Sequence, residues 1–173
     1  MKLISLRYVL SVGLGLSAAG LWFSPLPVIA QVPWEPGAPP LMPVPATPEA
    51  QRGAMNNVRV RVSWLKNATR TAPGYATGAD GLVWQAFQAL CVEYTTFTRS
   101  LNAQQTAYGA NELAELAAGL DILQRSFANY QEDVATGRPP AKALRDMCQV
   151  LGKAADVWLE EFNRDCARLR VGR

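Results

Sequence analysis

Cys148 and Cys166 are the residues whose chemistry is most open to question, and Cys91 is the only other cysteine in the chain. Both lie in the stretch LRDMCQVLGKAADVWLEEFNRDCARL (144–169), whose periodicity predicts one long helix. Residues 18 positions apart on a helix are separated by about 27 Å, whereas a disulfide needs Cα atoms within about 7 Å. Cys148 and Cys166 therefore cannot pair with each other, and Cys91 is the remaining partner.

The axial heights of the cysteines favour a Cys91–Cys148 disulfide. If consecutive helices are antiparallel, the helices that carry these two residues run in the same direction, and their heights differ by only about 4–5 Å at 1.5 Å per residue. Cys166 would lie more than about 20 Å too far along, so we predict that it is a free thiol. The bond would require the second and fourth helices to touch, which favours a three-helix core with the first helix laid against it.

The absence of histidine from the whole sequence removes several kinds of chemistry. A Ser-His-Asp triad, a histidine-based zinc site and a Glu-x-x-His di-iron site all need it. Met55 and Cys166 are weak candidates for a metal site, because a thioether and a thiolate at one end of a bundle suit Cu(I) or an unusual haem. We predict no enzyme activity, no catalytic residue and no cofactor.

The first 30 residues have the pattern of a secretory signal peptide. Lys2 and Arg7 precede an apolar run (8–23), and Val28 and Ala30 occupy the −3 and −1 positions of a cleavage site before Gln31. The run is short for the roughly 20 residues of a spanning helix, although an uncleaved anchor is the alternative. Without this leader the net charge falls from +3 to +1, which does not support nucleic-acid binding. We expect an exported protein of the periplasm or cell envelope.

A proline-rich linker is predicted over residues 31–47. QVPWEPGAPPLMPVPATP (31–48) contains seven prolines, which fix the backbone and remove amide donors, so neither helix nor sheet can form. The PxxP spacings would suit docking in an aromatic groove, but so many prolines produce them by chance. We therefore interpret the segment as a spacer.

Residues 48–173 are predicted to form an all-α domain of four helices in up-down-up-down order, with a shorter N-terminal helix and three long ones. Thr47-Pro48-Glu49 is a typical helix start, and the second, third and fourth helices should begin near Asp80, Asn111 and Pro140. Apolar residues recur at alternating spacings of three and four, which is typical of helices packed at small angles. The expected core residues are Met55, Val58, Val62 and Leu65; Val83, Phe87, Leu90, Tyr94, Phe97, Leu101 and Tyr108; Leu113, Leu116, Leu120, Leu123, Phe127, Tyr130 and Val134; and Leu144, Cys148, Leu151, Ala155, Trp158, Phe162, Cys166 and Leu169.

Charge is shared unevenly among the predicted helices. The first carries mostly bases and the third mostly acids, which we interpret as complementarity within the bundle rather than as a basic face for membrane contact. The second has only Glu93 and Arg99 between Gly81 and Tyr108. A helix so poor in charge is either shielded by its neighbours or part of an interface.

These patterns favour a non-enzymatic exported protein with an interaction or structural role in the cell envelope, whose partner is another envelope protein or a second copy. The alternative is a carrier of a small ligand or a Cu- or haem-type metal, with its site among the aromatic residues of the bundle core.

Overall fold

The computed structural model describes residues 45–74 and 79–173. The predicted signal peptide (1–30), its cleavage site between Ala30 and Gln31, and most of the linker (31–47) lie outside the described residues. Within the described ranges the chain forms helices and no strands, so the prediction of an all-α protein is confirmed. None of these helices combines the length and the hydropathy needed to span a membrane.

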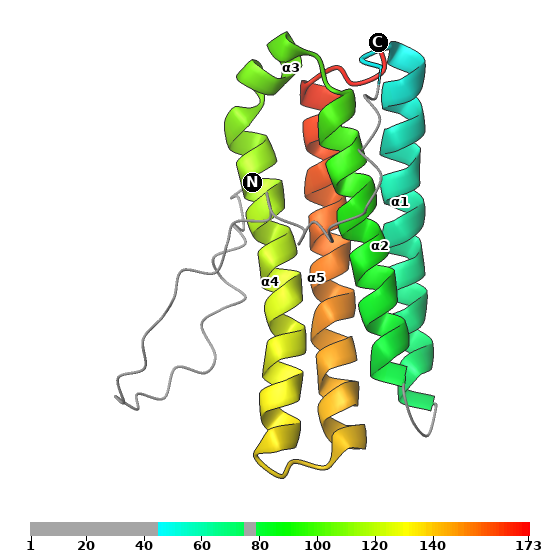
Figure 1. Ribbon diagram of the computed structural model, residues 1–173, viewed down its shortest axis with the longest axis vertical. Helices are drawn as coiled ribbons and strands as arrows, with labels where there is room; N and C mark the ends of the chain where they lie inside the picture. The colour runs from blue at the N-terminus through cyan, green and yellow to red at the C-terminus, as the bar shows by residue number, and fades with distance from the viewer. Residues whose placement is uncertain (1–44, 75–78) are drawn as a thin grey trace, which may run out of the picture. The chain divides into compact units, whose positions relative to one another are not determined.

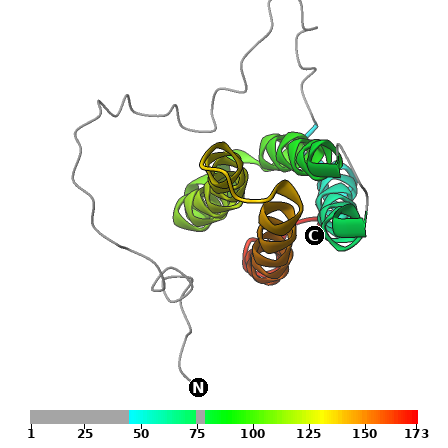
Figure 2. The same cartoon turned by 90° about the horizontal axis from the view of Figure 1, so that it is seen from below.

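Four long helices lie side by side in the described residues, and consecutive ones point in opposite directions (Figure 1). The elements are α1 (Pro48–Thr71), the 3-10 turn η2 (Ala72–Gly74), α2 (Ala79–Ser100), the short α3 (Ala103–Tyr108), α4 (Ala110–Ala135) and α5 (Pro140–Arg168). Seen along the helix axes, α1 lies between α2 and α5, while α4 completes the square (Figure 2). The predicted three-helix core is therefore wrong, since α1 packs on two neighbours. Nor is α1 the short helix: it has 24 residues and α2 has 22.

The start of α1 follows from its sequence. The Thr47 hydroxyl accepts a hydrogen bond from the Ala50 amide at 3.2 Å, Pro48 opens the helix and Glu49 lies in the first turn. A cap of this kind satisfies an amide that has no partner within the helix, and the acid complements the helix dipole. This predicted helix start is confirmed.

The second helix is shorter than the apolar spacing predicted. α2 ends at Ser100, and Asn102 begins α3 through a reciprocal cap: Asn102 Oδ1 accepts from the Gln105 amide at 2.8 Å, and Gln105 Oε1 accepts from the Asn102 amide at 3.1 Å. Tyr108 is consequently exposed, so its assignment to the core is wrong. The third long helix also starts earlier than expected, at Ala110 rather than after Asn111.

The core is built from the predicted apolar faces, and its centre is aromatic. The indole of Trp158 stacks on Phe162 with ring centroids 5.4 Å apart, while Tyr94 and Phe97 of α2 meet these rings at 5.7 and 4.9 Å. α2 and α5 thus face each other across the core through ring contacts. The residues buried as predicted are Val58, Val62, Leu65, Val83, Phe87, Leu90, Tyr94, Phe97, Leu101, Leu116, Leu120, Leu123, Phe127, Leu144, Cys148, Leu151, Ala155, Trp158, Phe162, Cys166 and Leu169.

Gly119 allows Trp158 to lie against α4. The indole Nε1–H donates to the Leu116 carbonyl at 2.8 Å, and a Cβ added at Gly119 would lie 2.6 Å from Trp158 Cδ1. A glycine in the middle of a helix lowers its stability by roughly 0.5–1 kcal/mol relative to alanine. Here that cost is offset by the close packing of the largest core side chain.

Two paired amides, buried Gln51 and half-buried Gln105, close one end of the bundle. Gln51, which is 3% exposed, donates from Nε2 to the Ser100 carbonyl at 3.1 Å and to Gln105 Oε1 at 2.7 Å. Its Oε1 accepts from the Gly172 amide at 2.9 Å and from Gln105 Nε2 at 3.3 Å. Gln105 Nε2 also donates to the Leu169 carbonyl at 3.2 Å. The pair therefore joins α1, the end of α2, α3 and the C-terminal segment.

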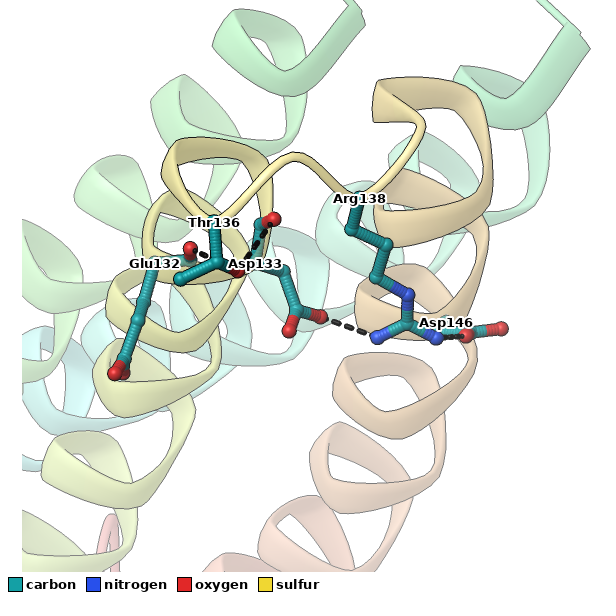
Figure 3. A network of polar contacts seen from close by, with 5 residues as sticks. All are labelled: Glu132, Asp133, Thr136, Arg138 and Asp146. Carbon is teal, nitrogen blue, oxygen red and sulfur yellow. Dashed lines mark hydrogen bonds and ion pairs between the residues drawn. The ribbon is translucent and has the colours of Figure 1, made fainter.

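The turn between α4 and α5 is fixed by Arg138. Its guanidinium forms ion pairs with Asp133 on α4 and Asp146 on α5 (Figure 3). Gly137 has a φ of 91°, and the Arg138 amide donates to the Asp133 carbonyl at 3.0 Å, which is the pattern of a Schellman C-cap. Figure 3 also shows the Thr136 hydroxyl at the last carbonyls of α4. The Arg138 pairs hold the turn rather than forming a binding site.

The end of α5 uses the same motif without glycine. Arg170 has a φ of 51°, and the Val171 amide donates to the Cys166 carbonyl at 3.0 Å. The left-handed conformation costs a non-glycine residue roughly 1–2 kcal/mol. It turns the chain so that Leu169 and Val171 are buried and Gly172 reaches Gln51.

Gly119→Ala should lower the free energy of unfolding by about 1–3 kcal/mol, because the new methyl group overpacks the site of Trp158. Gly53→Ala is the control, since nothing lies within 4 Å of a Cβ at that helical position, and it should stabilise by up to about 1 kcal/mol. Urea unfolding measures both. Equal effects of the two substitutions would contradict the close α4–α5 contact.

Gln105→Ala should lower the free energy of unfolding by about 1–3 kcal/mol, because Gln51 then loses a partner in a buried site. Its neighbour Gln104 is exposed on the same short helix, so Gln104→Ala should change stability by less than about 0.5 kcal/mol. Thermal and urea unfolding of the two variants provide the comparison. A Gln105 variant as stable as the Gln104 variant would show that the amide pair does not hold this end together.

Candidate functional site

The structure holds Cys91, Cys148 and Cys166 as free thiols. Burial raises the pKa of Cys91 to about 12, of Cys148 to about 11 and of Cys166 to about 12, and the Asp121 carboxylate adds to the effect at Cys91. A thiol with so high a pKa stays protonated near neutral pH and is a poor nucleophile. In this structure Cys148 and Cys166 act as small buried groups, while Cys91 is half-buried.

The Cys91–Cys148 bond stays a prediction. α2 and α5 occupy opposite corners of the square (Figure 2), and aromatic rings lie between them. A disulfide would have to bring the two Cα atoms within about 7 Å, so it would need the helices to approach more closely than the rings favour. Peptide mapping of the purified protein without reduction tests the pairing.

The weak metal candidates lie on different helices. Met55 is half-buried on α1 and Cys166 is buried on α5. In residues 45–74 and 79–173, no group of three or more His, Cys, Asp or Glu side chains could hold a metal ion. Met55 and Cys166 therefore have no such group to join.

The ion pairs that α1 forms with other helices go to α2 and α5 rather than to the acidic α4. Arg61 forms an ion pair with Glu93 of α2 at 3.3 Å, and Lys66 pairs with Asp156 of α5. The predicted complementarity between the first and third long helices is wrong, because α1 and α4 lie at opposite corners (Figure 2). Alternating apolar spacing identifies the inner face of each helix but not which helix becomes its neighbour.

Acidic groups gather where the start of α4 meets the end of α5. Asp165 is buried, and burial raises its pKa; the Arg168 guanidinium opposes this shift and Glu112 adds to it. Burial likewise raises the pKa of Glu161, with Arg164 opposing the shift and Asp165 adding to it. Ionised carboxylates here therefore cost stability, but one ion pair, Arg168 with Glu112 at 3.2 Å, reduces the repulsion.

A hollow of about 250 Å³ lies between the first turns of α2 and the second half of α4. Its walls include the aromatic side chains of Trp84, Phe127 and Tyr130, with Asp80 as the one charged residue of the lining. The remaining lining residues are Gly81, Gln124, Ala128 and Gln131. Concave sites that combine aromatic walls with a few polar groups are typical of small-ligand binding.

The aromatic residues proposed for a core site divide into three environments. Tyr94, Phe97, Trp158 and Phe162 pack against one another in the core. Trp64 is 54% exposed and lies under the Arg61 guanidinium, 4.5 Å from the ring centroid. Trp84, Phe127 and Tyr130 line the hollow instead. Sequence reasoning missed Asp80 as a site residue, because only the packing of α2 beside α4 places it in one hollow with Tyr130.

The outer face of α2 is the second feature that an interaction could use. Leu82 is 51% exposed and Val92 is 55% exposed. They belong to one face with Gln85, Ala89 and Thr96, at alternating spacings of three and four. No other described element covers these residues fully, so the low charge of α2 is not explained by shielding within the domain. We call these five residues the α2 outer face.

Asp165→Asn should raise the stability at neutral pH and reduce its pH dependence. A carboxyl whose folded pKa is raised stabilises the fold only while it is protonated, so stability falls as pH rises from the ordinary value of 3.8 through the folded pKa. The difference from the wild type should vanish at lower pH, where both side chains are neutral. Glu160→Gln, at an exposed position of the same helix, is the control. Urea unfolding from pH 3 to pH 7 measures the stability of each protein. An Asp165→Asn variant less stable than the wild type at pH 7 would contradict the cost of burying the ionised carboxylate.

No match to this chain was found among protein-family models, curated proteins or solved structures. The functional inference therefore depends on the hollow and on the α2 outer face.

Proposed function

We propose that this is a non-enzymatic interaction protein of the cell envelope. On this proposal residues 1–30 are a cleaved signal peptide, residues 31–47 are a proline-rich spacer, and residues 48–173 are an up-down-up-down four-helix bundle that carries the binding surface. The leader pattern of Lys2, Arg7 and Ala30 supports export. The prolines support a spacer that holds the domain away from its point of attachment or exit.

The α2 outer face is the observation that carries this proposal. Two large aliphatic side chains, Leu82 and Val92, are more than half exposed there, and the five residues of the face include no charge. Depletion of charge is the compositional mark of the central part of protein interfaces. By contrast, Arg52, Arg61 and Lys66 of α1 form ion pairs within the domain.

The partner is an envelope protein or a second copy of this chain. A second copy could place its own α2 outer face against this one, because a two-fold dimer uses the same surface on both subunits. The alternating spacing of Leu82, Gln85, Ala89, Val92 and Thr96 suits packing against another helix at a small angle.

Val92→Glu should abolish the association, because a charge at the centre of the contact would be buried without a partner. Val150→Glu is a matched control, since Val150 is 53% exposed on α5. Sedimentation of the purified domain measures self-association, and capture from envelope extracts with wild-type and variant domains measures binding to another protein. If both variants lost the association, or if neither did, the assignment of the binding surface to α2 would be contradicted.

A carrier of a small ligand is the second candidate function. The hollow lined by Trp84, Phe127 and Tyr130 supports it. The aromatic core does not, because its rings pack against one another. This version of the carrier differs from a copper or haem carrier, since its site is an aromatic and acidic hollow at the side of the bundle.

A further inference from the structure

We propose that the hollow between α2 and α4 binds a quaternary alkylammonium group, the chemistry shared by free choline and by phosphocholine lipid headgroups. The inference rests on the small-ligand alternative and names its ligand class. It follows from the charge, the aromatic walls and the size of the hollow.

Asp80 sets the sign of the ligand. It is the one charged residue of the lining, which contains no lysine or arginine. Among the described residues it forms no ion pair. It lies in the first turn of α2, where an acid complements the helix dipole, and its negative charge makes a cation the favoured ligand. Burial and then the Asp80 carboxylate raise the pKa of Tyr130, which is consistent with the two side chains lying close together at one side of the hollow.

The aromatic walls favour a weakly hydrated cation over a metal ion or an ordinary ammonium. An aromatic face attracts a cation through the ring quadrupole, most strongly for tryptophan, and this attraction is best realised with quaternary ammonium groups. Trp84 and Phe127 meet edge to face with centroids 4.9 Å apart, and Trp84 and Phe87 lie 5.6 Å apart. These contacts fix the Trp84 ring before any ligand arrives, so little ordering is required on binding.

The size of the hollow limits the ligand. Its volume of about 250 Å³ is below the roughly 300–1,000 Å³ of sites for drug-sized molecules. A trimethylammonium group with a short tail is therefore the appropriate scale. Gln124 and Gln131, whose side chains are exposed, offer amide groups in the lining of the hollow to a hydroxyl or phosphate of the tail.

Titration of the isotope-labelled domain with choline tests the proposal, using the shift of the Trp84 indole N–H signal, assigned by its absence in Trp84→Phe. The matched probe is 3,3-dimethylbutan-1-ol, which has the same shape as choline but no charge. We expect choline to shift the signal with an affinity at least about threefold above that of the alcohol. Equal binding of the two would overturn the cation class but leave a small-ligand site, whereas no shift with either would overturn both.

Variants of the lining residues test whether Asp80 supplies the negative charge that attracts choline. Asp80→Asn should weaken choline binding about two- to fivefold, the effect of losing an exposed ion pair, and should leave the alcohol unchanged. Gln131→Arg places a competing cation at an exposed rim position and should weaken choline binding as well, which keeps the test valid if Asp80→Asn destabilises the fold. Glu160→Gln should bind like the wild type. Unchanged choline affinity in the two hollow variants would place the binding elsewhere and overturn the proposal.

Flotation with phosphatidylcholine vesicles separates the two sources of the group. Vesicle binding that Asp80→Asn and Gln131→Arg both reduce identifies the lipid headgroup, while choline binding without vesicle binding identifies a soluble ligand. Val92 does not line the hollow. Failure of the Val92→Glu test of the α2 outer face would therefore leave the choline and vesicle tests unaffected.

Discussion

The paired amides of Gln51 and Gln105 are the constraint on which one end of the molecule depends. They accept from the Gly172 amide and satisfy the Ser100 and Leu169 carbonyls. Carbonyls of this kind are left without partners where a helix ends. Buried polar groups are stable only when all are satisfied, and no buried side-chain nitrogen or oxygen of the described residues lacks a partner. The break after Ser100 and the fold-back after Leu169 are therefore two halves of one arrangement.

How closely neighbouring helices approach along the sides of the bundle depends on the sizes of the side chains between them. Gly119 lets Trp158 lie against α4, so α4 packs more extensively on α5 than on α2. Between α2 and α4 the large rings of Trp84, Phe87 and Phe127 fill the contact. Beyond them, where the helices begin and end, the hollow remains. A site with a preformed aromatic wall thus results from packing that the core requires in any case.

Much of the fold could be predicted from the sequence because apolar spacing reports which face of each helix is buried. The start of α1 was predicted for a similar reason, since Thr47-Pro48-Glu49 acts locally. The prediction that the second helix continues to Tyr108 was wrong. It followed the apolar spacing at Leu101 and Tyr108, whereas Asn102-x-x-Gln105 is a helix-capping pattern that starts a new helix. The sequence did not show which helices become neighbours. Arg61 and Lys66 of α1 pair with Glu93 and Asp156, and Asp80 and Tyr130, which are 50 positions apart, line the same hollow. Such pairings depend on the arrangement of whole helices, which local patterns do not contain.

The contact between Gly172 and Gln51 joins residues 121 positions apart, and the Arg52 guanidinium also donates to the Gly172 carbonyl at 2.7 Å. Contacts of such high sequence separation form late in folding, because the loop they close must first lose its conformational entropy. During synthesis, α1 can pair with α2 early, but its own end cannot close until residue 172 has left the ribosome. A chain that has not yet reached residue 172 therefore lacks the bond that closes this end of α1.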